Sequence, residues 1–153
     1  MNCKALLFIT FIIFLFGKNI FADEIQIESS KIEVSKEGNI IKAINIKANI
    51  PNKKIEIEGD NSIYDKKIQQ LTITNNVKFY DNLKNIYLES EKIIYNQLTD
   101  RLQTFGKTFI RIEDKFYVYS NDLSYDRKLQ KISSDKETII KDKQQNIFNL
   151  EDS

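Results

Sequence analysis

Apolar and polar side chains alternate strictly along several short stretches of this chain. The pattern is clearest at residues 54–58, 71–74, 77–79 and 110–113, where an apolar residue takes every second position. Successive side chains of a β-strand point to opposite faces, so this period of two puts the apolar residues on one face and the polar residues on the other. These stretches are therefore predicted to be half-buried β-strands.

Turn-forming residues separate the strands at regular intervals. They occur at residues 37–39, 51–53, 65–67, 75–76, 81–82, 96–97, 113–114, 126–127 and 142–143. Strands at such even spacing indicate an all-β sandwich, barrel or roll. Residues 90–94 are compatible with a helical turn, but the repeat described next places them in a strand.

Three tyrosines mark a repeated unit. Tyr64, Tyr95 and Tyr125 are 31 and 30 residues apart, and a similar triplet follows each after 13 residues, at 77–79, 108–110 and 138–140. A repeat of this length is typical of folds in which one unit buries its apolar face only against its neighbours. We expect about two strands and two turns per unit, with a weaker first copy beginning at Lys31. The tyrosines should form a ladder along one edge, capping the core with their hydroxyls in water.

The first 22 residues have the order of parts found in a secretory signal peptide. A short segment with Lys4 precedes an apolar run at 5–16, and small Ala22 stands before two acidic residues. The run is shorter than the roughly 20 residues that a membrane-spanning helix needs. We predict cleavage after Ala22 and a β-domain over residues 23–153. The alternative is an uncleaved membrane anchor with Lys18 at the interface.

Composition limits the chemistry of the exported domain. Removal of residues 1–22 takes away Lys4, Lys18 and the one cysteine, which leaves 21 basic and 22 acidic residues, a net charge of −1. Mixed charges near neutrality give no basic stripe, so no nucleic-acid partner is expected. Without histidine or cysteine, the domain lacks the usual zinc, haem and nucleophile sets. We predict no enzyme activity, no cofactor, no metal site and a fold that depends on its core rather than on disulfides.

The repeat resembles the unit of the organic-solvent-tolerance (OstA) domain family. Residues 75–79 and 86–95, and again 105–108 and 121–126, match its order of Gly-Asn-Val, a short hairpin and a strand ending in Ala-Asp-x-x-x-Tyr. The resemblance covers about residues 32–150. Among the departures, the family glycine is clear only at Gly106, and Ser90 and Asn121 replace the strand alanine. The family occurs in the lipopolysaccharide-transport proteins LptA and LptC and at the N-terminus of the outer-membrane assembly protein LptD.

The resemblance implies an open β-jelly roll built from tandem repeats of about 30 residues, whose apolar interior accepts lipid acyl chains. The implied function is periplasmic binding of lipopolysaccharide for transport to the outer membrane, as an LptA-like bridge or an LptD N-terminal domain. Implied partners are the acyl chains, other OstA-like domains joined by edge strands, and the outer-membrane assembly barrel. The candidate groove residues are Ile55, Ile57, Leu71, Ile73, Val77, Phe79, Ile86, Leu88, Ile110, Ile112, Phe116 and Val118.

The residues themselves leave another interpretation open. A closed core would have the same apolar positions as a lipid groove, so a structural β-repeat module that binds proteins and no lipid is the alternative. The last unit begins a strand at residues 147–151, in register with 86–89 and 116–119. Such a strand leaves unpaired backbone groups, and we expect this edge to pair with another strand.

Overall fold

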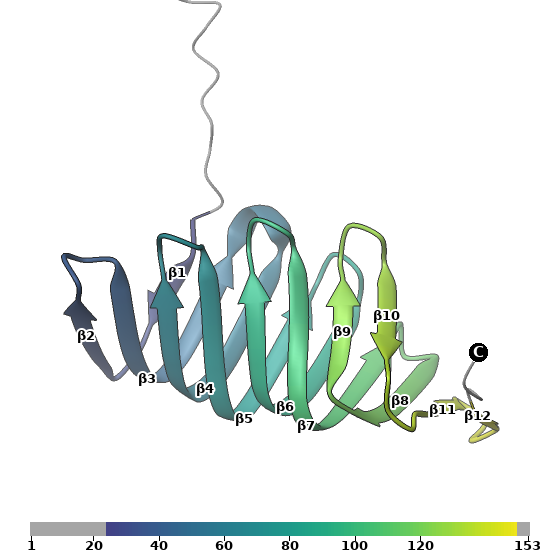
Figure 1. The fold of residues 1–153 in the computed structure, drawn as a ribbon. Coiled ribbons are helices and arrows are strands. Elements are labelled where there is room, and N and C mark those ends of the chain that lie inside the picture. Colours follow the sequence, from purple (N-terminus) through teal and green to yellow (C-terminus); the bar gives the residue numbers. More distant parts are fainter. Residues whose placement is uncertain (1–23, 150–153) are drawn as a thin grey trace, which may run out of the picture.

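The computed structural model describes residues 24–149, so the predicted signal peptide lies outside the described residues. Antiparallel strands make up most of this part of the chain, as the alternation predicted (Figure 1). The elements are β1 (Gln26–Glu28), β2 (Lys31–Ser35), β3 (Ile40–Ile50), the short 3-10 helix η1 (Pro51–Lys53), β4 (Ile55–Asp65), β5 (Gln70–Asp81), β6 (Ile86–Asn96), β7 (Arg101–Ile112), β8 (Phe116–Asn121), β9 (Leu123–Asp126), β10 (Lys131–Ser134), β11 (Ile139–Asp142) and β12 (Ile147–Asn149).

The strands form one continuous sheet that folds over on itself into two facing layers. Consecutive long strands pair along their whole length from β3 to β7, while β1 and β2 share β3, and β8 and β9 share β7. We call the layer with β2, β9 and β10 the first layer and the layer with β1, β8, β11 and β12 the second layer. Strands β3 to β7 bend at their middle and contribute one half to each (Figure 1).

The bends follow from residues that tolerate unusual backbone angles. Positive φ angles occur inside or between strands at Asn45, Asn75, Asn76, Gly106 and Asp122, and the strand register shifts near three of the bends. Glycine, asparagine and aspartate enter this region most readily. The sequence predicted a turn between two strands at residues 75–76. It is instead a bend within continuous β5, because the chain keeps pairing on both sides of it.

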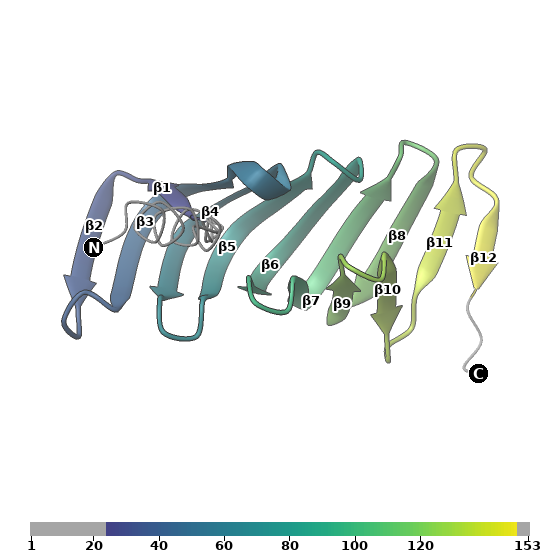
Figure 2. The same cartoon turned by 90° about the horizontal axis from the view of Figure 1, so that it is seen from above.

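The turns form two parallel rows along the edges of the layers. First-layer turns at 36–39, 66–69, 97–100 and 127–130 are joined by backbone hydrogen bonds from Lys66 to Asn39, Gln97 to Gln69 and Arg127 to Asp100. Second-layer turns at 51–54, 82–85 and 113–115 are joined in the same way, from Asn82 to Lys54 and Glu113 to Asn85. Figure 2 looks down on both rows. The bends therefore form the floor of a trough, and we call the line between the two rows of turns its mouth.

Inward-facing side chains stack from one repeat to the next in straight rows. One row of the first layer is Tyr64, Leu71, Tyr95, Leu102 and Tyr125, each paired across strands with the next. A row of the second layer is Ile57, Phe79, Leu88, Ile110 and Val118. The rings of Phe79 and Tyr125 meet edge to face between the layers, with centroids 6.5 Å apart. The tyrosine ladder and the stacking of repeats are thus confirmed.

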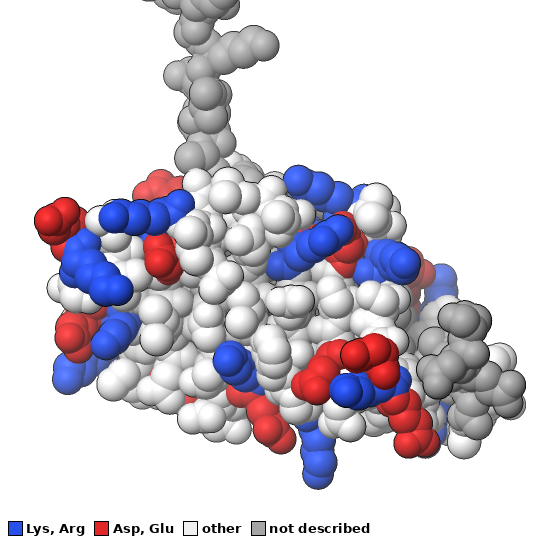
Figure 3. Space-filling view, in the orientation of Figure 1, with Lys and Arg blue, Asp and Glu red and all other residues white. Residues whose placement is uncertain are grey.

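The outer face of the first layer carries little organised charge (Figure 3). Figure 3 shows basic and acidic side chains interspersed on the outer face of the first layer, which is largely uncharged in its middle. Within residues 24–149, no helix has the length and apolar character needed to cross a membrane.

Candidate functional site

The twelve candidate groove residues all lie on the inner faces of the two layers. Nine of them are almost completely buried and fill the central part of the trough with their own side chains: Ile55, Ile57, Leu71, Ile73, Val77, Phe79, Leu88, Ile110 and Val118. Ile86 and Ile112 pack at the border of this core. Phe116, near the C-terminal end of the trough, is 43% exposed. The central interior is therefore filled by protein rather than left open.

Both ends of the trough expose apolar side chains of the inner face. At the N-terminal end, Ile32 and Val34 pair with the inward positions of β3 and are 51% and 57% exposed. At the C-terminal end, Phe148 follows Val118 and Ile140 in the second-layer row and is 49% exposed. A closed hydrophobic core does not usually leave inward-facing apolar side chains exposed to water. The inner face is thus closed in the middle and open at both ends.

A hollow lies beside each end of the closed centre. The N-terminal hollow, about 550 Å³, is lined on its apolar side by Ile25, Ile27, Ile32, Ile41 and Tyr64. The C-terminal hollow, about 540 Å³, has Ile86, Ile112, Tyr125 and Ile132 in its wall. Ile86 and Ile112 are therefore the candidate groove residues that line a hollow along the trough.

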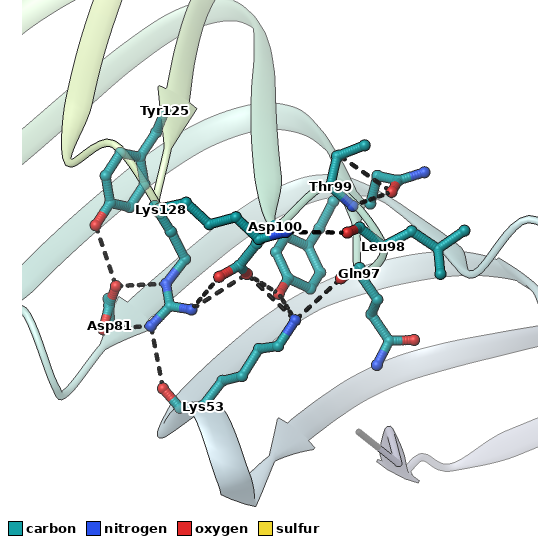
Figure 4. Close-up of polar contacts among 11 residues, drawn as sticks. Lys53, Asp81, Gln97, Leu98, Thr99, Asp100, Tyr125 and Lys128 are labelled. Carbon is teal, nitrogen blue, oxygen red and sulfur yellow. Dashed lines mark hydrogen bonds and ion pairs between the residues drawn. The ribbon is translucent and has the colours of Figure 1, made fainter. Parts of the chain in front are cut away.

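A buried cluster of charges joins the two rows of turns between these hollows (Figure 4). Arg127, from the first layer, donates hydrogen bonds to Asp81 of the second layer through Nε at 2.6 Å and Nη2 at 3.1 Å. Its Nη1 donates to both carboxylate oxygens of Asp100, at 2.9 and 3.2 Å, and its Nη2 also donates to the carbonyl oxygen of Lys53 at 3.1 Å. Arg127, Asp81 and Asp100 are each more than nine-tenths buried. One guanidinium thus ties both rows together.

A second cation completes the cluster from the opposite side. Lys53 Nζ donates to the carbonyl oxygen of Gln97 at 3.0 Å and lies 3.4 Å from Asp100 Oδ1, while its carbon stem rises from η1. The hydroxyl of Tyr95 donates to the same Asp100 oxygen at 2.6 Å, and that of Tyr125 donates to Asp81 at 3.1 Å. We call Lys53, Asp81, Tyr95, Asp100, Tyr125 and Arg127 the mouth cluster.

Ion pairing determines the protonation states within the mouth cluster. Burial by itself raises the pKa of Asp100, but the Tyr95 hydrogen bond and the charges of Arg127 and Lys53 outweigh it, so the pKa lies below 3.8. Burial by itself lowers the pKa of Arg127, and its two carboxylate partners more than reverse this. Burial and the charge of Asp81 raise the pKa of Tyr125. Near neutral pH Asp100 is therefore ionised beside the charged Arg127, and the Tyr125 hydroxyl stays neutral.

The environment of two tyrosines differs from the sequence-based expectation. Tyr95 and Tyr125 are fully buried, and their hydroxyls bond to carboxylates rather than to water. Tyr64, the first of the ladder, is half-buried and donates to the Gln97 side chain at 2.9 Å. The reason is the opposite layer, which removes water from the central positions of the ladder and supplies charged partners instead.

Little in the sequence indicated the mouth cluster. Asp81, Arg127 and Lys53 lie in segments that were predicted as turns, and the alternation of β5 ends at Asp81. One signal was available: Arg127 follows Tyr125 by two residues, at the place of Gln97 after Tyr95 and Lys66 after Tyr64. The position alone does not reveal that Arg127 and Gln97 are buried whereas Lys66 is exposed.

The charged groups of the mouth cluster pair with one another. Within residues 24–149, no group of three or more aspartate, glutamate, cysteine or histidine side chains is placed to hold a metal ion. Asp81 pairs with Arg127, and Asp100 pairs with Arg127 and Lys53, which is the arrangement of a buried ion-pair network.

Sequence comparison finds no family model and no curated protein that matches the chain. Structural comparison does find matches. LptH from Pseudomonas aeruginosa, described as the LptA-homologous periplasmic component of the lipopolysaccharide transport device, superimposes with a TM-score of 0.64 at 11% identity, covering 73% of this chain and 82% of LptH. At this identity the similarity establishes the fold and nothing finer. The chain has an open, LptA-like β-jelly roll, as the repeat and its resemblance to the OstA unit predicted.

Proposed function

We propose that this protein binds lipopolysaccharide acyl chains in the interior of its trough and forms a segment of a periplasmic transport path. The observation that carries the proposal is the gradient of exposure along the inner face. Apolar side chains that are sealed in the middle become about half exposed at both ends, at Ile32 and Val34 on one side and Phe116 and Phe148 on the other. The exposed apolar side chains at each end allow the apolar interior to continue into an adjoining domain. The shared fold with a periplasmic lipopolysaccharide-transport component supports this function.

The energetics favour an apolar ligand at these ends. Transfer of each acyl methylene from water to an apolar environment contributes about 0.8 kcal/mol. The hollows give such a chain a place to start, because each is lined by isoleucine and tyrosine side chains next to the sealed core. Longer chains require the layers to separate along the mouth, since the centre is already filled.

Edge strands supply the second part of the proposal. β12 and β10 at one end, and β1 and β2 at the other, each have one described pairing partner. Pairing with an OstA-like domain at either end would satisfy these backbone groups and extend the interior. A protein that bridges two membranes pairs at each of its ends with a different partner chain. An LptD-like N-terminal domain pairs at its C-terminal end with residues that lead to an outer-membrane barrel. Site-specific cross-linking at β2 and β12 in cells distinguishes these placements.

Export belongs to the same proposal. The charged, apolar and small-residue segments of residues 1–22 support cleavage after Ala22 and a periplasmic location. The intact mass of protein recovered from the periplasm should lack residues 1–22. Full-length chain in the inner membrane would argue for an anchor instead.

Lipid binding is tested by charging the inner face where it is already accessible. Phe116 and Tyr119 lie on the same strand, point to opposite faces and have nearly equal exposure, 43% and 44%. Phe116→Asp should weaken binding of purified lipopolysaccharide, because it puts a carboxylate beside the acyl chains. Tyr119→Asp should leave binding unchanged. Equal binding by both variants and the parent would remove this end of the interior from the lipid path.

The packed centre also fits the alternative function, a structural β-repeat module that binds proteins without lipid. Nine of the twelve candidate groove residues are sealed by their neighbours, as in an ordinary core. Native mass spectrometry of the protein released from cells separates the two functions. Copurified lipid of lipopolysaccharide mass supports the carrier, and its absence, together with no binding of added lipopolysaccharide, supports the module.

A further inference from the structure

The mouth cluster contains two kinds of contact, which differ in the layers that they join. Asp100 and Tyr95 lie in the same layer as Arg127, and Arg127 Nη1 donates to both carboxylate oxygens of Asp100, at 2.9 and 3.2 Å. Asp81 lies in the opposite layer. It accepts hydrogen bonds from Arg127 Nε at 2.6 Å, from Arg127 Nη2 at 3.1 Å and from the Tyr125 hydroxyl at 3.1 Å. Separation of the two rows of turns therefore breaks the contacts of Asp81 and leaves Arg127 with Asp100.

Lys53 makes a second connection across the mouth. From the second-layer row, its Nζ donates to the first-layer carbonyl oxygen of Gln97 at 3.0 Å and lies 3.4 Å from Asp100 Oδ1 (Figure 4). The carbonyl oxygen of Lys53 accepts a hydrogen bond from Arg127 Nη2 at 3.1 Å. We call the contacts that Asp81 and Lys53 make with first-layer residues the clasp.

The clasp lies between the two hollows of the trough. Gln97, which accepts a hydrogen bond from Lys53, lines the N-terminal hollow, and Tyr125, which donates one to Asp81, lines the C-terminal hollow. Beneath the clasp the layers are sealed, and the rings of Phe79 and Tyr125 meet between them. An apolar chain that extends from one hollow into the other must therefore lie between the layers at the clasp.

Apolar and polar contacts between the layers respond differently to such a chain. Core side chains exchange one apolar neighbour for another, because methylene groups fill the space between them. A methylene chain has no hydrogen-bond donor or acceptor, so it cannot replace the partners of Asp81. Arg127 keeps Asp100 when the rows part, whereas Asp81 loses Arg127, and loss of one partner from a buried ion pair is strongly unfavourable. The clasp is therefore the part of the interior that opposes a long chain.

We propose that the clasp acts as a gate that keeps the two hollows separate, and that its opening admits a chain long enough to occupy both. The inference rests on the proposed function, because it requires acyl chains in the interior. With the clasp closed, each hollow accepts a short chain from its own end of the trough. With the clasp open, the rows of turns part at Asp81 and Lys53, Asp100 stays with Arg127, and a long chain lies across the centre.

Asp81→Asn weakens the gate with the smallest change of shape. The amide keeps the size of the carboxylate and removes its charge, while Arg127 retains Asp100. A ligand that binds only the open state gains apparent affinity in proportion to the population of that state. Asp81→Asn should therefore raise the affinity for a long-chain amphiphile about ten-fold, through faster association, and leave the affinity for a short-chain amphiphile unchanged.

The probes are octyl, dodecyl and hexadecyl maltoside, each titrated below its micelle-forming concentration. They share one uncharged headgroup, so a difference between them reports chain length alone. Calorimetry gives the affinities, and stopped-flow tyrosine fluorescence gives the association rates. Thr108→Val is the matched control, because it removes a buried hydrogen bond to Thr104, 2.8 Å long, near the floor of the trough and does not touch the mouth. It should lower the stability of the fold and leave all three affinities unchanged.

A distance across the mouth reports the opening itself. Leu83 lies in a second-layer turn and Leu129 in a first-layer turn, and they are 58% and 69% exposed. Nitroxide labels on cysteines at these two positions can be followed by electron paramagnetic resonance. The distance between the labels should increase when hexadecyl maltoside binds and stay the same when octyl maltoside binds.

Each outcome decides between the gate and the lipid interior. A gain of affinity that grows with chain length in Asp81→Asn, together with the longer label distance, establishes the gate. The same effect of Asp81→Asn at every chain length, an equal gain in Thr108→Val, or a fixed label distance with hexadecyl maltoside bound overturns the gate and leaves the lipid interior standing. If the parent protein binds none of the maltosides, the proposed lipid function fails and the gate fails with it. If Asp81→Asn does not fold, Lys53→Met weakens the other side of the clasp and gives the same test.

Discussion

Arg127 links parts of the chain that are far apart in sequence. Its partners Asp81 and Asp100 are 46 and 27 residues away, and both pairs are buried. A buried ion pair gains little over an apolar replacement, but removal of one partner leaves an uncompensated charge. The mouth cluster therefore holds the two layers in one register. Substitution of any single charged member should lower the stability of the fold.

Replacement of Arg127 tests this dependence directly. Arg127→Met should lower the free energy of unfolding by about 3–5 kcal/mol, because Asp81 stays buried without its cation and Asp100 keeps only Lys53. Arg101→Met, in which the lost arginine is largely exposed, should change it by about 1 kcal/mol or less. Chemical denaturation followed by circular dichroism measures both. Equally small losses of unfolding free energy in the two variants would show that water reaches the mouth cluster.

Asp100 makes the folding stability depend on pH in the acidic range. Its pKa is below 3.8 in the folded protein and near 3.8 in the unfolded chain, so the unfolded state binds the proton more readily. The stabilisation from charged Asp100 is therefore fully present above about pH 4 and is lost as the pH falls through the lower, folded value. The parent protein should exceed Asp100→Asn in unfolding free energy at neutral pH, and the difference should shrink at about pH 3. A difference that grows on acidification would contradict this sign.

The bent strand is the element that turns a flat sheet into a trough. Each bend needs residues that accept positive φ or that leave room for the neighbouring strand. Gly106 in β7 has φ +80°. Gly59 in β4 serves the second purpose, because a Cβ there would overlap the Cγ2 methyl of buried Ile73 and approach the carbonyl oxygen of Asn75 to 3.3 Å.

A methyl group at this bend should therefore be costly. Gly59→Ala is expected to lower the free energy of unfolding by about 1–3 kcal/mol, as overpacking of a close-packed core does. Gly38→Ala is the comparison, since a Cβ at Gly38 meets nothing within 4 Å and adds only backbone strain at φ +86°. That strain is about 1 kcal/mol. In urea titrations, Gly59→Ala should lower the unfolding free energy more than Gly38→Ala. The reverse order would show that β5 moves at the bend to make room for the added methyl group.

Under the proposed function, the molecule as a unit is a short segment of a longer apolar channel. Its two ends differ, with β1 and β2 at one and β10, β11 and β12 at the other, so copies that stack must join unlike ends. Such head-to-tail contacts extend as open chains unless the rotation between copies closes a ring. In such a contact we expect the exposed inner residues at each end to supply the apolar part.

The contributions of the N-terminal and C-terminal ends to end-to-end association can be tested separately. Ile32→Asp should block the N-terminal end and Phe148→Asp the C-terminal end, because each puts a charge into the joined interior. Sedimentation should show concentration-dependent oligomers for the parent, monomers for each variant alone and dimers for an equal mixture of the two. Ile63→Asp, at an outward position that is 47% exposed, serves as the control and should associate like the parent. Monomers in the mixture would show that unlike ends do not join.

Local patterns in the sequence determined the architecture. Alternation within five residues predicted strands, and the spacing of Tyr64, Tyr95 and Tyr125 predicted the stacked repeats. The same alternation put the candidate residues within 54–58, 71–74, 77–79 and 110–113 on one face of their strands. These inferences succeed because side-chain direction in a strand depends only on position along it. A bend at Asn75-Asn76 was predicted as a turn, since both use the same residue types.

The tertiary structure alone decided which inner positions are sealed and which are open. Ile57 and Phe116 both occupy apolar positions of strands, yet Ile57 lies in the closed centre, whereas Phe116 lies near the C-terminal end of the sheet and is 43% exposed. It also decided that Arg127 meets Asp81 across the mouth. That contact depends on the folding of one layer over the other, which brings together residues that no local pattern relates, and burial then makes their charges matter because water no longer screens them.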